Sequence, residues 1–159
     1  MKICDFLAPG DVIEDLDAGA TVPEILGKLA RPVAATTGIP IETLVAPLVA
    51  RERLGATAVG DGVAFPHGKI PGLNELRAAF GRSRKGGAFG ASEGLTHFFF
   101  ALFVPESRPG IQLHALAKIA GLMKSSTMRT ALLNAEGAPE LYQLLVSDDA
   151  SAGGGHEAD

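Results

Sequence analysis

The segment His97–Val104, which reads HFFFALFV, constrains the fold of this chain more than any other. It lies between Gly94 and Pro105 and contains seven consecutive apolar residues. Such a run is too short to span a bilayer, which takes about 20 residues. A short run that is apolar at every position is typical of a strand with both faces covered. The segment therefore predicts a central strand buried between two layers.

Helical patterns lie on both sides of this strand in the sequence. Thr21-Val22-Pro23-Glu24 has the spacing of a capping box with a proline in the first turn, so a helix is predicted to begin there. Pro32 is expected to bend or end it, because a proline ring clashes with the carbonyl group four residues earlier. Apolar spacing predicts further helices at residues 40–54, 109–123, 126–135 and 139–146, and short strands at residues 58–59, 63–65 and 77–82. Helices that alternate with strands indicate an α/β layered fold.

Length and charge indicate one neutral domain with an acidic end. The 159 residues have the usual size of one domain, and 47% are hydrophobic, which is near the globular average. Four of the 18 acidic residues lie in the last thirteen positions, which hold no Lys or Arg, so residues 1–146 carry 14 acids and 14 bases. A neutral body argues against nucleic acid or an anionic membrane surface as the main partner. Residues 147–159 have no large apolar side chain and are expected to form a disordered acidic tail.

The first residues indicate where the protein works. Asp5 stands where a signal peptide would be apolar, and no apolar run is long enough to insert into a membrane. Cys4 is the single cysteine, so no internal disulfide can form, which fits a reducing compartment. We therefore expect a cytosolic protein.

His67 is the first candidate functional residue. It follows a β-type stretch and stands between Pro66 and Gly68. Proline fixes the approach of the backbone, and glycine lets incoming groups come close. An imidazole presented in this way suits a chemical role, although a lone histidine in a loop is more often simply exposed.

His114 is the second candidate, in the first turn of the helix that follows Pro109 and Gly110. Unsatisfied N–H groups and the helix dipole favour anions at that position. The alternative is a structural histidine bonded to the backbone, and His97, at the start of the Phe-rich strand, is expected to be structural. A zinc site built from His67, His97 and His114 is possible by residue type. No HxxxH or CxxC spacing supports it, so no metal is expected.

The twenty residues from Ala50 to Lys69, ARERLGATAVGDGVAFPHGK, resemble the active-site signature of the fructose/mannitol-type enzyme IIA proteins of the phosphoenolpyruvate-dependent phosphotransferase system. The branch they resemble most is that of the nitrogen-regulatory IIA proteins. The resemblance extends over residues 1–146, which it defines as one IIA type-2 domain. It includes the strand ending FFALFVP, the segment QLHAL around His114, and ELY at residues 140–142.

The resemblance implies a mixed β-sheet flanked by helices and a phosphoryl carrier in which His67 accepts phosphate from a phosphohistidine carrier protein of the HPr type. It implies that His114 and Arg51 hold the phosphoryl oxygens. Phosphoryl transfer mainly needs positioning and charge stabilisation, and arginine offers a fixed fork of donors. Arg51, in the last turn of a helix, could instead complement the helix dipole. Thr57 and Gly68 are expected to support the phosphoryl site.

Two positions depart from the signature. Ala56 stands where serine is usual, which removes a hydroxyl, and Asp61 stands where asparagine is common, which adds a negative charge near the site. No nucleotide, metal or other cofactor is implied.

Three functions remain open on the sequence. The first is a regulator whose phosphorylation state controls binding to targets such as kinases or ion transporters. The second is a detached sugar-specific IIA subunit that passes phosphate to a IIB protein. The sequence contains no IIB or membrane domain, which favours the regulator. The third is a binding module that has lost transfer. In each case Phe65, Ile70 and Leu73 are expected to ring an apolar docking patch around His67.

Overall fold

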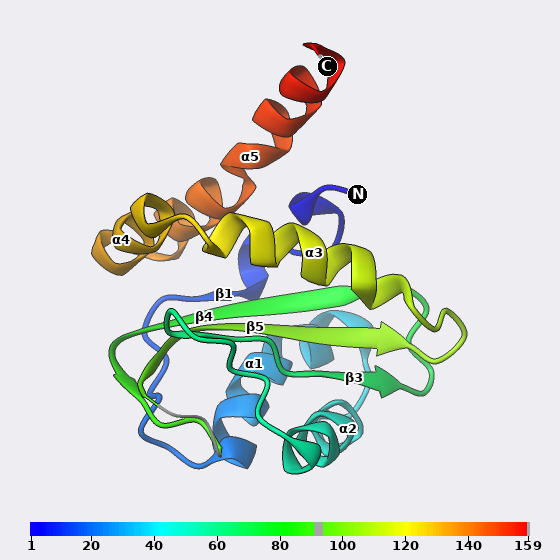
Figure 1. The fold of residues 1–159 in the computed structure, drawn as a ribbon. Coiled ribbons are helices and arrows are strands. Elements are labelled where there is room, and N and C mark those ends of the chain that lie inside the picture. The colour runs from blue at the N-terminus through cyan, green and yellow to red at the C-terminus, as the bar shows by residue number, and fades with distance from the viewer. Residues whose placement is uncertain (91–93, 159) are drawn as a thin grey trace.

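The computed structural model describes the backbone of residues 1–90 and 94–158, and side chains for residues 1–90 and 94–149 (Figure 1). Within these ranges five α-helices and five strands follow two short 3-10 helices, η1 and η2. The helices are α1 Val22–Thr37, α2 Ile41–Leu54, α3 Ile111–Met123, α4 Ser126–Asn134 and α5 Ala138–Ala158, and the 3-10 helices are η1 Ile3–Asp5 and η2 Pro9–Asp11. The strands are β1 Val12–Ile13, β2 Val63–Ala64, β3 His67–Ile70, β4 Arg77–Gly87 and β5 Thr96–Pro105.

The strands form one mixed sheet with β5 at its centre, as the Phe-rich segment predicts. β4 pairs with β5 antiparallel, and β1 pairs with the far side of β4 in parallel. β2 and β3 both pair in parallel with the other side of β5, one after the other along its length. β3 therefore lies at an edge of the sheet.

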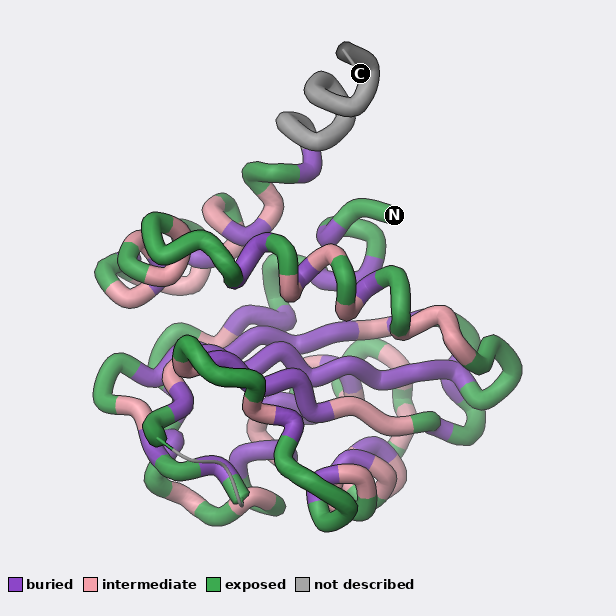
Figure 2. The backbone as a smooth tube through the Cα atoms, viewed as in Figure 1, coloured by how far each residue is buried: buried purple, intermediate pink, exposed green. Residues whose placement is uncertain are grey.

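Alternate side chains of β5 enter two different cores. Phe98, Phe100, Leu102 and Val104 pack with α3, α4 and α5 on one face. Phe99, Ala101 and Phe103 pack with α1 and α2 on the other. Figure 1 shows the sheet between these helical layers, and Figure 2 shows β4 and β5 buried along most of their length. A strand covered on both faces has no polar side to offer solvent, which is why its sequence shows no alternation.

The first helix does not end at Pro32. Helix α1 starts at the expected capping box, in which Glu24 N donates to Thr21 Oγ1 at 3.3 Å, and continues to Thr37. Proline in a helix interior costs about 3 kcal/mol. One face of α1 is buried on both sides of the proline, and each fully buried Leu, Ile or Val contributes about 1.5–3 kcal/mol. The buried residues are Ile25, Leu26, Leu29, Ala30 and Val33.

The folded body extends past residue 146, the boundary that the sequence predicts. Helix α5 runs to Ala158, and Asp149 is buried against the amino-terminal segment. Its carboxylate accepts hydrogen bonds from Ile3 N at 2.8 Å and Cys4 N at 3.1 Å. An acidic residue with no apolar neighbours reads as a tail residue, but here it satisfies the free N–H groups of η1. Residues 147–149 therefore belong to the body.

Strand β4 extends to Gly87, past the predicted end at residue 82, and carries a buried arginine. Arg82 is fully buried, and its guanidinium donates to Glu14 O at 3.0 Å, Leu132 O at 2.9 Å and Ala135 O at 2.6 Å. The carbonyl groups at the end of α4 need donors, and the negative end of the helix dipole favours a cation there. Arg82 thus ties α4 to the sheet.

Candidate functional site

A tight loop at residues 60–62 precedes the candidate site in the chain. Gly60, Asp61 and Gly62 all have positive φ, at 91°, 55° and 75°, and the chain turns back so that Ala58 bridges Ala64. The two glycines adopt this conformation without strain, whereas Asp61 is the one non-glycine residue with positive φ among those described. Its carboxylate lies 3.7 Å from Arg129 on α4, so the extra charge at this position has a partner.

His67 is the first residue of β3, which the sequence does not predict as a strand. It pairs with Leu102, and partners in a parallel ladder point to the same face, so the half-buried His67 ring points to the α3 side of the sheet. Its Nδ1 lies 2.9 Å from Phe65 O. A carbonyl oxygen only accepts, so Nδ1 carries the hydrogen. In the neutral ring this leaves the lone pair on Nε2.

Gly68 faces the opposite side and is the point at which α2 touches β3. A Cβ atom at this position would lie 2.9 Å from both C and Cβ of Pro47 and 3.1 Å from Leu48 Cδ1. Real Cβ contacts are longer, so only glycine lets the helix approach this closely. The contact sets the position of α2 relative to His67.

Arg51 lies in the last turn of α2, on the same helix face as Pro47 and Leu48, which are four and three residues earlier. Its Nη1 donates to Gly55 O at 2.9 Å. In the state that the structure describes, Arg51 therefore caps the carboxyl end of its own helix, the alternative that the sequence leaves open. The Arg51 side chain is long enough to leave Gly55 O and bind another acceptor. Helix α2 packs against β3, and β3 is an edge strand.

His114 lies in the first turn of α3, on the face of the sheet to which His67 points. The side chain is exposed, and its ring makes no hydrogen bond to any residue whose side chain the structure describes. Gly110 precedes the helix in a left-handed conformation and offers no side-chain cap. The structural alternative, a histidine bonded to the backbone, does not hold for His114. It does hold for His97, whose Nδ1 lies 2.9 Å from Ser83 O.

Thr57 is buried and bonded to a residue that the sequence does not single out. Its Oγ1 donates to Glu52 Oε1 at 2.7 Å, and its N–H donates to Glu52 Oε2 at 2.9 Å. A hydroxyl has one proton to donate, so Thr57 has none free for a phosphoryl group in this geometry. The burial of Glu52 in the last turn of an amphipathic helix is not visible in the sequence, where it reads as a surface charge beside Arg51.

The prediction that Phe65, Ile70 and Leu73 form an apolar docking patch around His67 is wrong, because all three side chains are buried in the two cores. Other apolar residues are exposed in the segments that carry the site residues: Leu54 at the end of α2, Val59 before the tight loop, and Leu113 beside His114. Between the segment 59–65 and α3 lies a mainly apolar groove of about 450 Å³.

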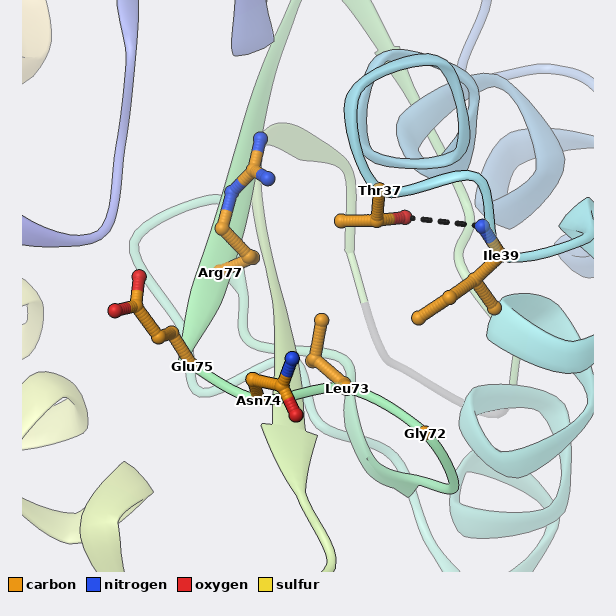
Figure 3. A pocket seen from close by; sticks show the side chains of 7 residues that line it. All are labelled: Thr37, Ile39, Gly72, Leu73, Asn74, Glu75 and Arg77. Atoms are coloured by element: carbon orange, nitrogen blue, oxygen red, sulfur yellow. Dashed lines mark hydrogen bonds between the residues drawn. The ribbon is translucent and has the colours of Figure 1, made fainter.

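A second cavity, of about 290 Å³, is lined by none of the candidate phosphoryl-site residues, which are Arg51, Thr57, His67, Gly68 and His114. It lies between the end of α1 and the turn after β3, and Figure 3 shows Thr37 with its Oγ1 bonded to Ile39 N at 3.2 Å and Arg77 across the cavity. Among residues with described side chains, no three His, Cys, Asp or Glu groups lie close enough together to hold a metal ion. No helix in the described part of the chain is both long and apolar enough to cross a membrane.

Comparison with known proteins identifies the class. Residues 6–148 match the model of the family described as "Phosphoenolpyruvate-dependent sugar phosphotransferase system, EIIA 2". The chain therefore belongs to the enzyme IIA type-2 family of the phosphotransferase system, as the resemblance of residues 50–69 predicts.

Within this family the chain is similar to nitrogen regulatory proteins. It is 33% identical to the nitrogen regulatory protein of Bradyrhizobium diazoefficiens over 153 residues, which cover 96% of this chain and 99% of the relative. The crystal structure of IIA-Ntr from Neisseria meningitidis superimposes with a TM-score of 0.80 at 29% identity, covering 90% of this chain and 98% of that one. The mannitol IIA in complex with phosphorylated IIB from Escherichia coli has the same fold, with a TM-score of 0.73 at 15% identity over 88% of this chain and 96% of that one.

Proposed function

We propose that this protein carries a phosphoryl group on Nε2 of His67, received from the phosphohistidine of a small carrier protein. One observation carries the proposal: the Phe65 carbonyl accepts from His67 Nδ1 at 2.9 Å, which leaves Nε2 as the nucleophile. The Nε2 lone pair forms the new P–N bond while the P–N bond of the donor breaks, and the donor imidazole keeps that electron pair. The Nδ1 proton stays in its bond to Phe65.

His114 and Arg51 supply the charge that this transfer needs. The phosphoryl group spreads its charge over three oxygens, and fixed donors stabilise it. His114 is free to turn toward the group, since it is exposed and has no partner among the described side chains. Arg51 reaches the group by giving up its bond to Gly55 O, an exchange that trades one neutral acceptor for a charged one.

The phosphorylated and free states are proposed to bind different targets, which makes the protein a regulator of the nitrogen-regulatory type. A phosphoryl group adds about 1.5–2 negative charges, by analogy with other phosphorylated side chains. Leu54, Val59 and Leu113 offer exposed apolar area in the segments that carry Arg51, His67 and His114. Desolvating that charge against an apolar partner is unfavourable, so one state favours apolar docking and the other disfavours it. The full-length similarity to nitrogen regulatory proteins supports this choice. We also propose that the protein acts in the cytosol.

The test is reconstitution with phosphoenolpyruvate, enzyme I and the small phosphocarrier. The expected product has one phosphate per chain, labile in acid and stable in base, and His67→Ala should gain none. Equal labelling of His67→Ala would contradict the proposal. Pull-downs with His67→Ala and with the phosphorylated protein should then recover different targets, such as a kinase or an ion transporter. Rapid transfer to a sugar-specific IIB protein would instead assign the chain to sugar uptake.

A further inference from the structure

Glu52 is a buried carboxylate in the last turn of α2. It is 7% exposed and forms no ion pair within 4.0 Å with any residue whose side chain the structure describes. Its two oxygens accept instead from the N–H and the hydroxyl of Thr57. Burying an unpaired carboxylate is costly, and the carboxyl end of a helix disfavours negative charge. Both effects lower the stability of α2. The presence of Glu52 at this position therefore points to a role outside the helix.

A continuous chain of hydrogen bonds leads from Glu52 to the His67 ring. Glu52 fixes Thr57 at two points. Thr57 O accepts from Phe65 N at 3.2 Å, and Phe65 O accepts from His67 Nδ1 at 2.9 Å. Phe65 itself is held by its ring, which stacks on Phe100 with centroids 6.5 Å apart. The carbonyl that orients His67 thus belongs to a residue whose main chain depends on Thr57.

We propose that Glu52 is a positioning residue for phosphoryl transfer. It holds Thr57, and through the main chain of Thr57 and Phe65 it holds the carbonyl that keeps the hydrogen of His67 on Nδ1. This rests on the proposed role of His67 as phosphoryl acceptor. Positioning requires two hydrogen-bonding atoms in the right place and does not require the negative charge, which distinguishes it from a direct electrostatic effect on the phosphoryl group.

The test compares Glu52→Ala and Glu52→Gln with Glu42→Gln, a matched control on the exposed first turn of the same helix. The first readout is the His67 tautomer, from the ¹⁵N chemical shifts of its ring in the unphosphorylated protein. The second is the rate of phosphoryl transfer from the phosphocarrier at saturating donor. Glutamine can still accept from Thr57 N and can donate to its hydroxyl, so this variant keeps both contacts.

We expect Glu52→Ala to populate both neutral tautomers of His67 and to slow transfer by about 10- to 100-fold, the loss that follows when a reacting group is misplaced by up to about 1 Å. Glu52→Gln should stay within about threefold of the wild type, because its hydrogen bonds are retained. Wild-type tautomer and rate in a folded Glu52→Ala would overturn the proposal. Slow transfer by Glu52→Gln with the wild-type tautomer would also overturn it, since charge and not position would then matter.

If Glu52→Ala does not fold, Thr57→Val and Thr57→Ser decide the matter. The valine variant loses the hydroxyl contact and should slow transfer, while the serine variant keeps that contact and should restore it. A valine variant that matches the wild type in tautomer and rate would refute the role of Glu52. A wild-type protein that accepts no phosphate would instead refute the proposed function, whereas the tautomer measurement still tests Glu52 on its own.

Discussion

Replacing Gly68 with alanine tests how the contact between α2 and β3 builds the site. The added Cβ would lie 2.9 Å from two atoms of Pro47, and favourable carbon–carbon contacts begin at about 3.5 Å. Helix α2 must therefore move outward by about 0.6 Å or more. Overpacking of this kind costs about 1–3 kcal/mol, and the lower entropy of the unfolded alanine chain returns about 0.4–1 kcal/mol. The net loss of stability is expected to be about 1–2 kcal/mol.

The same displacement of α2 should affect the rate of phosphoryl transfer more strongly than it affects the stability of the fold. At about 2–4 °C per kcal/mol for a chain of this size, Tm should fall by about 2–8 °C, which leaves the protein folded at 25 °C. Arg51 moves with α2 while His67 stays on β3, and misplacement by a fraction of an ångström to 1 Å costs about 10- to 100-fold in rate. Calorimetry and the reconstituted transfer assay measure the two effects.

Gly27→Ala is the matched control, since a Cβ at this helical position meets nothing within 4 Å. It should leave transfer unchanged and raise stability by about 0.5–1 kcal/mol, the usual gain for alanine over glycine inside a helix. If Gly68→Ala has the wild-type Tm and transfer rate, the reasoning is refuted, because α2 would then not have to move to accommodate the added Cβ. A lower Tm with an unchanged rate would show that the α2 contact is structural only.

Three further predictions follow from single contacts. Asp149→Ala should lower the free energy of unfolding by about 1–3 kcal/mol, because Ile3 and Cys4 lose a charged cap; an unchanged calorimetric Tm would show that α5 does not stabilise the amino terminus. The pKa of the Cys4 thiol is raised by desolvation first and then by the hydrogen bond and charge of Asp149, so Asp149→Asn should speed its labelling by a thiol reagent at pH 8. His114→Ala and Arg51→Lys should fold normally and slow transfer by about 100-fold and 10-fold, respectively, as measured by phosphate uptake, and a wild-type rate would remove the residue from the site.

The long elements could be predicted from the sequence because each has a strong local signal. The unbroken apolar run predicts β5 as the central strand, and the capping box at Thr21 predicts the start of α1. Pro32 misleads because the local cost of a proline is outweighed by a buried face that only the tertiary structure supplies. The two-residue β1 and the polar β3 carry no periodicity of their own, and their pairing partners alone make them strands.

The candidate site divides in the same way. The order Pro66, His67, Gly68 indicates a presented histidine, but the face to which the ring points depends on its register with β5. The docking of Asp149 on residues more than 140 positions away depends on contacts that no window of the sequence contains. Glu52 bonds to Thr57 only five residues along the chain, but its burial is not visible in the sequence, where it reads as a surface charge. Composition places Asp149 in a tail, since hydrogen bonds to free N–H groups leave no apolar pattern.

The position of the phosphoryl group on the His67 ring tests the central claim most directly. A two-dimensional ¹H–¹⁵N spectrum that correlates ring protons with both ring nitrogens, recorded before and after phosphorylation, distinguishes the two nitrogens. The Phe65 carbonyl predicts a protonated Nδ1 before the reaction and a single phosphoryl group on Nε2 after it. A phosphoryl group on Nδ1 of His67, or on His114, would contradict the account.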